Sequence, residues 1–277
     1  MTSVDVEAAT ALILREEWGD RRTWFEFATS QAECRPVVAE SGGAIVGTGV
    51  GTANGSVGWV GTIFVAPEHR RAGLGRALTE AVCEDLAAAG CRTLVLVSTS
   101  EGLPLYENLG FRIQTHYRIL EAPGLAPVDG EGPVAAAGPV VRAFEPGDLD
   151  AMSALDAAAT GEDRAHALRR FASPTSARVL ARPDASVAGF VVRAPWGGGA
   201  TIAADPDDAI RILEARRLAA GPGGRVRVGI VEENAAGLAR LEREGLHPVW
   251  SAPRMVRGEP LEWRPDWIWG QFNHALG

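Results

Sequence analysis

The sequence predicts an α/β (α+β) protein in which two copies of one fold follow each other along the chain. Short apolar runs that are typical of strands alternate with segments of helical periodicity in both halves of the 277 residues. A segment rich in alanine, proline and glycine, 122–138, shows no periodicity and separates the halves. Behind it the order of elements starts again. We therefore expect an N-terminal domain at 1–121, a linker at 122–138 and a C-terminal domain at 139–277.

Composition and charge limit the classes of function. Hydrophobic residues make up 46% and charged residues 22% of the chain, as in soluble globular proteins. No apolar run reaches the roughly 20 residues that span a membrane, so we expect no membrane partner. A net charge of −8 argues against broad nucleic-acid binding. The three cysteines are odd in number and lack metal-ligand spacing, which predicts no metal site and a reducing cytoplasm.

The first half follows a clear order of elements. In sequence, we expect helices at Val6–Trp18 and Thr23–Gln31, strands at Arg35–Glu40, Ala44–Thr52 and Val57–Val65, a helix at Gly73–Ala89 and a strand at Arg92–Ser98. Gly19 and Asp20 divide the first two helices. Asn54-Gly55 marks a tight turn between strands, and Gly90 ends the long helix.

The stretch between the third strand and the long helix carries the strongest signal. It reads Arg70, Arg71, Ala72, Gly73, Leu74, Gly75, Arg76, Ala77. Glycines let the backbone turn and approach a ligand closely, and the first amides of a helix have no partner within it. These amides and the helix dipole attract anions. With three arginines nearby, the stretch predicts a phosphate-binding site.

The pattern Arg70-x-x-Gly73-x-Gly75 after an apolar strand resembles the signature of the GNAT superfamily of N-acetyltransferases. Its glycines differ in number and spacing from those of dinucleotide-binding and P-loop fingerprints. A second segment, Leu105–Phe111, resembles the superfamily's Leu-Tyr-Glu-x-Leu-Gly-Phe motif. The resemblance implies two tandem GNAT folds, each a mixed, mostly antiparallel, twisted sheet flanked by helices.

This resemblance also implies a coenzyme A site, with acetyl-CoA or another acyl-CoA as co-substrate. The pyrophosphate would lie on the amides of Arg71–Ala77, and the pantetheine would run along Phe64 and Val65 like an added strand. Many family members have an asparagine where this chain has Thr99, whose hydroxyl could take its place. Tyr106 would give a proton to the leaving thiolate.

Contacts to the acceptor amine are less specific in the sequence. In the family, the region of the second helix commonly lines the acceptor pocket, so Trp24 and Glu26 are candidates. Trp59 could form a wall of the acyl or acceptor site. Helical spacing makes a core position the more frequent one for Trp24, and strand alternation makes a core position about as frequent as a site position for Trp59. The strand Val57–Val65 carries no carboxylate, which leaves the base as Glu26, a water chain or an amine that arrives neutral.

The second half repeats the order of elements without the same chemistry. We expect a strand and helix cap at Val140–Leu149, strands at Ser176–Arg182 and Ser186–Arg193, a helix at Asp207–Ala219, a strand at Arg225–Val231 and a helix from Asn234. Where the first half has arginine and glycines, the second has Asp205-Pro206-Asp207-Asp208, whose carboxylates would repel a pyrophosphate. Leu241 stands at the offset of Tyr106. We expect this half to have lost coenzyme binding and to cover the acceptor site or to form a partner surface.

The aromatic end of the chain supports a covering role for this half. Four large aromatic residues lie close together there: Trp263, Trp267, Trp269 and Phe272. They either pack the two halves together, which we favour, or wall a pocket.

Three functions are compatible with these features. The expected one is transfer of an acetyl or other acyl group from acyl-CoA to a small-molecule amine, in specialised metabolism or resistance. Paired GNAT-like folds also occur in aminoacyl-tRNA dependent amide-forming enzymes, and a tRNA could contact the arginines at 164, 169, 170, 211, 216 and 217. A non-catalytic acyl-CoA sensor is the third. The acceptor and the oligomeric state do not follow from the sequence.

Overall fold

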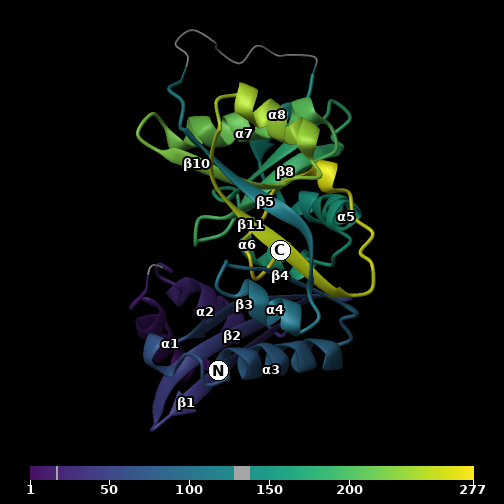
Figure 1. Ribbon diagram of the computed structural model, residues 1–277. Helices are drawn as coiled ribbons and strands as arrows, with labels where there is room; N and C mark the ends of the chain where they lie inside the picture. The colour runs from purple at the N-terminus through teal and green to yellow at the C-terminus, as the bar shows by residue number, and fades with distance from the viewer. Residues whose placement is uncertain (17, 128–137) are drawn as a thin grey trace. The chain divides into compact units, whose positions relative to one another are not determined.

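The computed structural model describes residues 1–16, 18–127 and 138–277, which form two compact units (Figure 1). Unit 1 comprises Met1–Gln114, Pro253–Leu261 and His274–Gly277, and unit 2 comprises Thr115–Ala252 and Glu262–Asn273. The units are therefore not two consecutive blocks of sequence, because unit 1 includes segments from the end of the chain. Most of the expected linker, 128–137, lies outside the described residues, and its first two residues belong to a strand.

Unit 1 contains most of the elements that the first half predicts. They are α1 (Val6–Ile13), α2 (Arg22–Ser30), β1 (Cys34–Ser41), β2 (Ala44–Asn54), β3 (Val57–Val65), α3 (Leu74–Ala88), β4 (Thr93–Val97) and α4 (Leu103–Asn108), with parts of β5 (Arg112–Pro123) and β11 (His247–Gly258). The first element is a 3-10 turn, Ser3–Asp5, so no short strand precedes α1. Among the described residues α1 ends at Ile13, earlier than predicted.

The sheet of unit 1 is mixed and mostly antiparallel, as predicted. β1–β2, β2–β3 and β4–β11 pair antiparallel, and β3–β4 pair parallel. Helix α3 covers one face: a Cβ at Gly49 or Gly51 of β2 would meet Val82 at 3.2 or 3.0 Å. Because side chains alternate along a strand, Val50 and Thr52 point to the opposite face. Helix α1 contacts β2, and α2 contacts β1.

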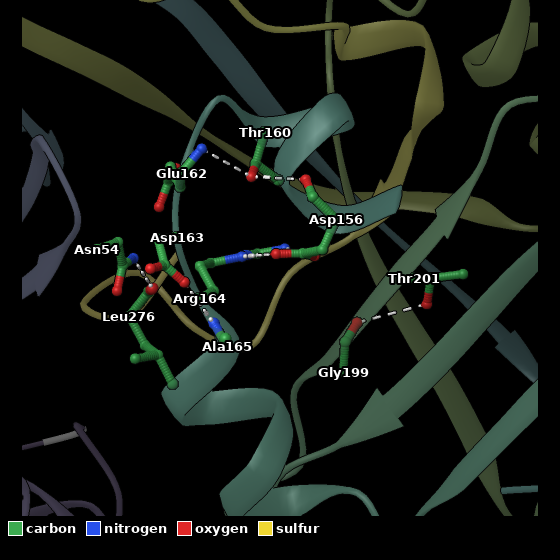
Figure 2. Close-up of polar contacts among 10 residues, drawn as sticks. All are labelled: Asn54, Asp156, Thr160, Glu162, Asp163, Arg164, Ala165, Gly199, Thr201 and Leu276. Atoms are coloured by element: carbon green, nitrogen blue, oxygen red, sulfur yellow. Dashed lines mark hydrogen bonds and ion pairs between the residues drawn. The ribbon is translucent and has the colours of Figure 1, made fainter. Parts of the chain in front are cut away.

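A segment from the end of the chain packs on this second face within unit 1. Thr52 Oγ1 donates a hydrogen bond to the carbonyl of Ala275 at 2.8 Å, and Asn54 Nδ2 donates to the carbonyl of Leu276 at 2.8 Å (Figure 2). A Cβ at Gly61 would lie 2.2 Å from the Cβ of Ala275. Only glycine fits at this position of β3, because any side chain would displace the segment.

Unit 2 contains a second α/β arrangement. Its elements are β6 (Val140–Ala143), α5 (Leu149–Thr160), α6 (Ala165–Phe171), β7 (Ala177–Ala181), β8 (Val187–Arg193), β9 (Gly199–Ala203), α7 (Pro206–Ala220), β10 (Arg225–Val231), α8 (Ala235–Arg243) and β12 (Ile268–Gly270), with parts of β5 and β11. Five strands form an antiparallel sheet in the order β12-β9-β8-β7-β6, and β10 pairs antiparallel with β5. The sequence did not predict α6, β9 or β12, which are too short to show a period.

Two buried aromatic residues near the end of the chain stabilise unit 2 itself. Trp269 packs in its main hydrophobic cluster and donates from Nε1 to the carbonyl of Ala203 at 3.2 Å. Phe272 is fully buried, with its ring 5.8 Å from that of Phe171. Both residues therefore belong to the core of this unit.

A buried ion pair links α5 to the segment that leads into α6 in unit 2 (Figure 2). Arg164 donates from Nε and Nη2 to the carboxylate of Asp156 at 3.0 and 2.6 Å, and these side chains are 2% and 1% exposed. Burial lowers the pKa of Arg164, but the carboxylate more than offsets this, so the pKa is raised. The guanidinium also lies over the Phe272 ring, 5.4 Å from its centre.

Across the described residues, none of the helices has the length and apolar character that crossing a membrane requires.

Candidate active site

A β-bulge interrupts the pairing of β3 with β2. Thr62 and Ile63 together lie opposite the single residue Gly49. Thr62 has a φ of 53°, a left-handed conformation that is unusual for a β-branched residue. Two side chains hold it there. Trp24 donates from Nε1 to Thr62 Oγ1 at 2.9 Å, and Thr48 donates from Oγ1 to the Thr62 carbonyl at 3.0 Å.

Near this bulge, β3 separates from β4. The parallel pairing covers only Val57–Trp59 against Thr93–Val95. From residue 60 to residue 65, no strand in the described part of the chain pairs with this edge of β3. Its main-chain groups can therefore pair with an extended ligand. One of them is already engaged, since the carbonyl of Val65 accepts a hydrogen bond from Arg70 Nε at 3.0 Å.

The start of α3 presents amides that have no acceptor. Gly73 adopts a left-handed conformation with φ of 84° and precedes the 15 residues of the helix. The carbonyl of Gly73 accepts from the amide of Ala77, but no acceptor among the described residues pairs with the amides of residues 74–76. A Cβ at Gly73 would meet nothing within 4 Å, so this helix start is open. Its amides and dipole suit an anion.

The three arginines near the helix start differ in what they contact. Arg70 is turned toward Val65 and lies 3.7 Å from Glu16. Arg76 donates to Glu80 at 3.1 Å along the helix. Arg71 is exposed, and none of the described residues accepts a hydrogen bond from its side chain. Of the three, Arg71 is the one that can reach a ligand without breaking a contact.

Tyr106 lies in α4, beside the main hydrophobic cluster of unit 1. Its ring packs on Phe111 at 6.2 Å in an edge arrangement. Burial and, secondarily, Cys83 raise the pKa of Tyr106 to about 12, so the phenol is protonated at neutral pH. Among the described residues, none forms a hydrogen bond with its hydroxyl. The group can therefore act as a proton donor.

Thr99 has a structural role, and its predicted contact to the coenzyme stays a prediction. It is exposed, and its Oγ1 accepts a hydrogen bond from the amide of Gly102 at 3.2 Å in the turn that leads into α4. The hydroxyl proton is still available to a ligand, since a hydroxyl both donates and accepts.

The structure does not bring together the three predicted acceptor contacts. Trp24 and Trp59 are 2% and 1% exposed and belong to the core. Glu26 is exposed on the other face of α2, beside Arg22 in a shallow pocket. For Trp24 the core position that helical spacing favoured is the observed one, but its indole N–H also holds the bulge, and helical spacing carries no information about that long-range partner.

We expect Trp24→Phe to lower the free energy of unfolding by about 1 kcal/mol, because it removes one buried hydrogen bond but keeps an aromatic ring. Urea unfolding would measure the change. A cycle with Thr62→Val should show that the two losses are not additive. Additive losses would mean that the contact does not stabilise the bulge.

The corresponding helix of unit 2 is capped by its own chain. The carboxylate of Asp205 accepts from the amides of Asp207 and Asp208 at 2.8 and 3.3 Å, and Pro206 occupies the first helical position. Leu241 is fully buried in the core of unit 2. Neither feature that marks unit 1 occurs here.

The arginines that could have contacted a tRNA are partly engaged within unit 2. Arg164 is buried in its ion pair, and Arg216 is also buried. Arg217 donates to the carbonyls of Pro123 and Glu244. The buried Arg164 and Arg216 do not contribute to an exposed basic surface.

Known families and relatives match both halves of the chain. The model of the acetyltransferase (GNAT) family matches residues 5–111, and that of an acetyltransferase (GNAT) domain matches 152–270. The "Uncharacterized N-acetyltransferase YitH" of Bacillus subtilis is 30% identical over 228 residues, which cover 79% of this chain and 76% of that protein.

Solved structures share the fold over nearly the whole chain. A "Putative Acetyltransferase" from Pyrococcus horikoshii has a TM-score of 0.81 at 22% identity, over 100% of this chain and 94% of that one. A tandem GNAT protein from the clavulanic acid biosynthesis pathway has a TM-score of 0.61 at 14% identity, over 94% and 96% of the two chains. Both likenesses concern the fold.

Proposed function

Because this chain belongs to the GNAT family of N-acetyltransferases, which generally use acetyl-CoA as co-substrate, we propose that unit 1 transfers an acetyl or another acyl group from acyl-CoA to the amine of a small molecule. The observation that carries this proposal is the start of α3. Its unpaired amides, the left-handed Gly73 and the available Arg71 follow directly on the unpaired edge of β3.

In this proposal, the amides of residues 74–76 and the side chain of Arg71 hold the pyrophosphate of the coenzyme. The edge of β3 at Phe64 and Val65 pairs with the pantetheine, once Arg70 releases the carbonyl of Val65. The hydroxyl of Thr99 donates a hydrogen bond to the pantetheine as well. When bound, the coenzyme supplies the activated acyl group.

The chemistry then requires two proton movements and one charge to be stabilised. The amine nitrogen forms a bond to the acyl carbon, the carbon–sulfur bond breaks, and the amine loses a proton to a base or to water. Tyr106 gives its phenolic proton to the thiolate and regains one from solvent. A main-chain amide at the bulge stabilises the negative charge that develops on the acyl oxygen, a contribution of about 3 kcal/mol.

We infer that unit 2 has lost coenzyme binding. The carboxylate of Asp205 occupies the amides at the start of α7, where the equivalent amides of α3 are open. The role of unit 2 toward the acceptor amine is also part of the proposal. A purified protein should therefore bind one coenzyme per chain in a calorimetric titration.

A pair of substitutions at Gly73 tests the pyrophosphate site. Gly73→Asp and Gly73→Asn add side chains of nearly the same size in open space, and both residues tolerate the left-handed conformation. Only aspartate brings a negative charge to the helix start. We expect Gly73→Asp to weaken coenzyme A binding about tenfold more than Gly73→Asn, measured by calorimetry at low salt.

Equal affinities of the two variants would contradict binding at the start of α3. Transfer itself is measured as thiol released from acetyl-CoA in the presence of a panel of amines. A wild-type protein that binds coenzyme A but releases no thiol with any amine would favour the acyl-CoA sensor over the enzyme.

A further inference from the structure

A cation lies on the buried side of α2. The buried residues of this helix are Trp24, Phe25, Phe27 and Ala28. Arg21 directly precedes the helix, three residues before Trp24 and seven before Ala28. At this spacing it extends the same stripe. Its side chain is half-buried, and burial lowers the pKa of Arg21, an effect that Asp20 partly offsets. An arginine nevertheless stays charged at neutral pH.

Arg21 has no counter-ion in the described part of the chain. No ion pair or side-chain hydrogen bond joins it to another described residue. Asp20, the adjacent carboxylate, accepts from the amide of Arg22 at 2.8 Å instead. Partly desolvating a charge without a partner is costly, and proteins rarely keep one without a use. The neighbouring Arg22 shows the usual solution, since it pairs with Glu7 at 2.6 Å on the exposed side.

Contacts of neighbouring residues place the start of α2, where Arg21 lies, near the bulge of β3. Trp24, one helical turn further on, reaches Thr62 of the bulge. The carbonyl of His274 lies 3.2 Å from the position of a Cβ at Gly61, the residue before Thr62. Burial and, secondarily, the charge of Arg21 lower the pKa of His274 to about 4. All of these groups belong to unit 1.

Of Arg21, Thr62 and His274, only Arg21 carries a charge at neutral pH. At neutral pH the imidazole of His274 is uncharged, with one nitrogen that donates and one that accepts. It cannot neutralise Arg21. The bulge is also where the proposed reaction places the acyl carbon, so a ligand beside Arg21 would lie close to the amine that attacks.

We propose that Arg21 binds an anionic group of the acceptor, which makes the substrate a small primary amine that carries a carboxylate or a phosphate. This inference rests on the proposed acyltransferase function. Arg21 is a substrate-binding residue in this account, and it neither moves a proton nor contacts the coenzyme.

The test compares three amines of similar size in wild-type protein and variants. Ethanolamine is neutral apart from its amine, β-alanine adds a carboxylate, and 2-aminoethyl phosphate adds a phosphate. We expect both anionic amines, or the one whose anion fits, to be acetylated with a lower KM than ethanolamine. The two anionic arms distinguish a carboxylate from a phosphate substrate.

Arg21→Met removes the charge and keeps the length of the side chain, Arg21→Lys restores a charge, and Arg22→Met is the matched control on the exposed side. We expect Arg21→Met to raise KM for the anionic amine about 10- to 100-fold with kcat little changed. It should leave ethanolamine unaffected. Arg21→Lys should recover part of the loss, and Arg22→Met should behave as wild type. Thermal unfolding of each variant identifies any loss of folded protein.

Two results would overturn the inference. One is that wild type shows no preference for an anionic amine, and the other is that Arg21→Met affects all three amines equally. If none of the three amines is acetylated, calorimetry measures their binding to the complex of the protein with coenzyme A. Arg21→Met should then weaken the binding of an anionic amine, and an anionic amine that does not bind, or that binds both proteins equally, counts against the inference. Coenzyme binding by the Gly73 variants is measured separately, so failure of the proposed function is recognised independently.

Discussion

Tyr106→Phe is expected to lower kcat for acyl transfer about 100-fold, while the affinity for coenzyme A stays the same. The substitution removes only the hydroxyl. The ring still packs on Phe111, so the fold of unit 1 should be retained. The phenol is protonated over the whole neutral range, because burial raises the pKa of Tyr106 to about 12. The loss in kcat should therefore be the same from pH 6 to pH 9.

Tyr117→Phe is the matched control for this prediction, since the chain has two tyrosines and Tyr117 lies in unit 2. Steady-state kinetics with acetyl-CoA and an amine that the wild-type protein acetylates would measure kcat for both variants. An unchanged kcat in Tyr106→Phe would mean that the hydroxyl does not donate the proton and that Tyr106 only packs. Should cellular function also be unchanged in that variant, a non-catalytic sensor would be the better account.

Asp156→Asn is expected to lower the free energy of unfolding of unit 2 by about 3–5 kcal/mol. The carboxylate is 1% exposed and accepts two hydrogen bonds from Arg164, which is 2% exposed. Asparagine has almost the same shape but removes the negative charge that pairs with the buried guanidinium, which leaves Arg164 with only its weaker electrostatic interaction with Glu162. The aromatic ring of Phe272 over the guanidinium supplies far less than a carboxylate does.

The matched control is Asp207→Asn, the same change in an exposed ion pair. Asp207 is 70% exposed and lies 2.7 Å from Arg240, so we expect at most about 1 kcal/mol there. Because two units need not unfold together, hydrogen exchange of α5 and α6 should accompany urea unfolding. Equal losses in the two variants would contradict the prediction. A shape-matched apolar pair, Asp156→Leu with Arg164→Met, should recover most of the stability if the uncompensated charge is the cause.

The sequence predicted the tandem fold and its mixed, mostly antiparallel sheets, and this prediction is confirmed. Strand β3, the glycine loop and α3 are recognisable because apolar alternation, positive-φ glycines and helix periodicity are local properties. The same is true of the difference between the helix starts at Gly73 and Asp205. The roles of the coenzyme-binding residues and of Tyr106 stay predictions until binding and kinetics are measured.

Other features of the candidate site could not be predicted from local pattern. Arg70 turns to the carbonyl of Val65, whereas the sequence grouped it with Arg71 at the helix start. Trp24 was named as an acceptor contact, yet its indole holds Thr62 of the bulge. Arg21, which we propose for acceptor binding, carried a signal in the sequence: a positive charge that extends the apolar stripe of a helix.

By itself, the sequence determined most of the strands and helices, that the fold occurs twice, and where a helix start leaves amides open, because each follows from residues that are neighbours along the chain. Only the tertiary structure decided that His274–Gly277 pack in unit 1, that Arg164 pairs with Asp156, and that Arg21 has no counter-ion among the residues that the structure describes. These outcomes depend on which distant side chains meet after folding, and periodicity gives the face of an element but not its partner.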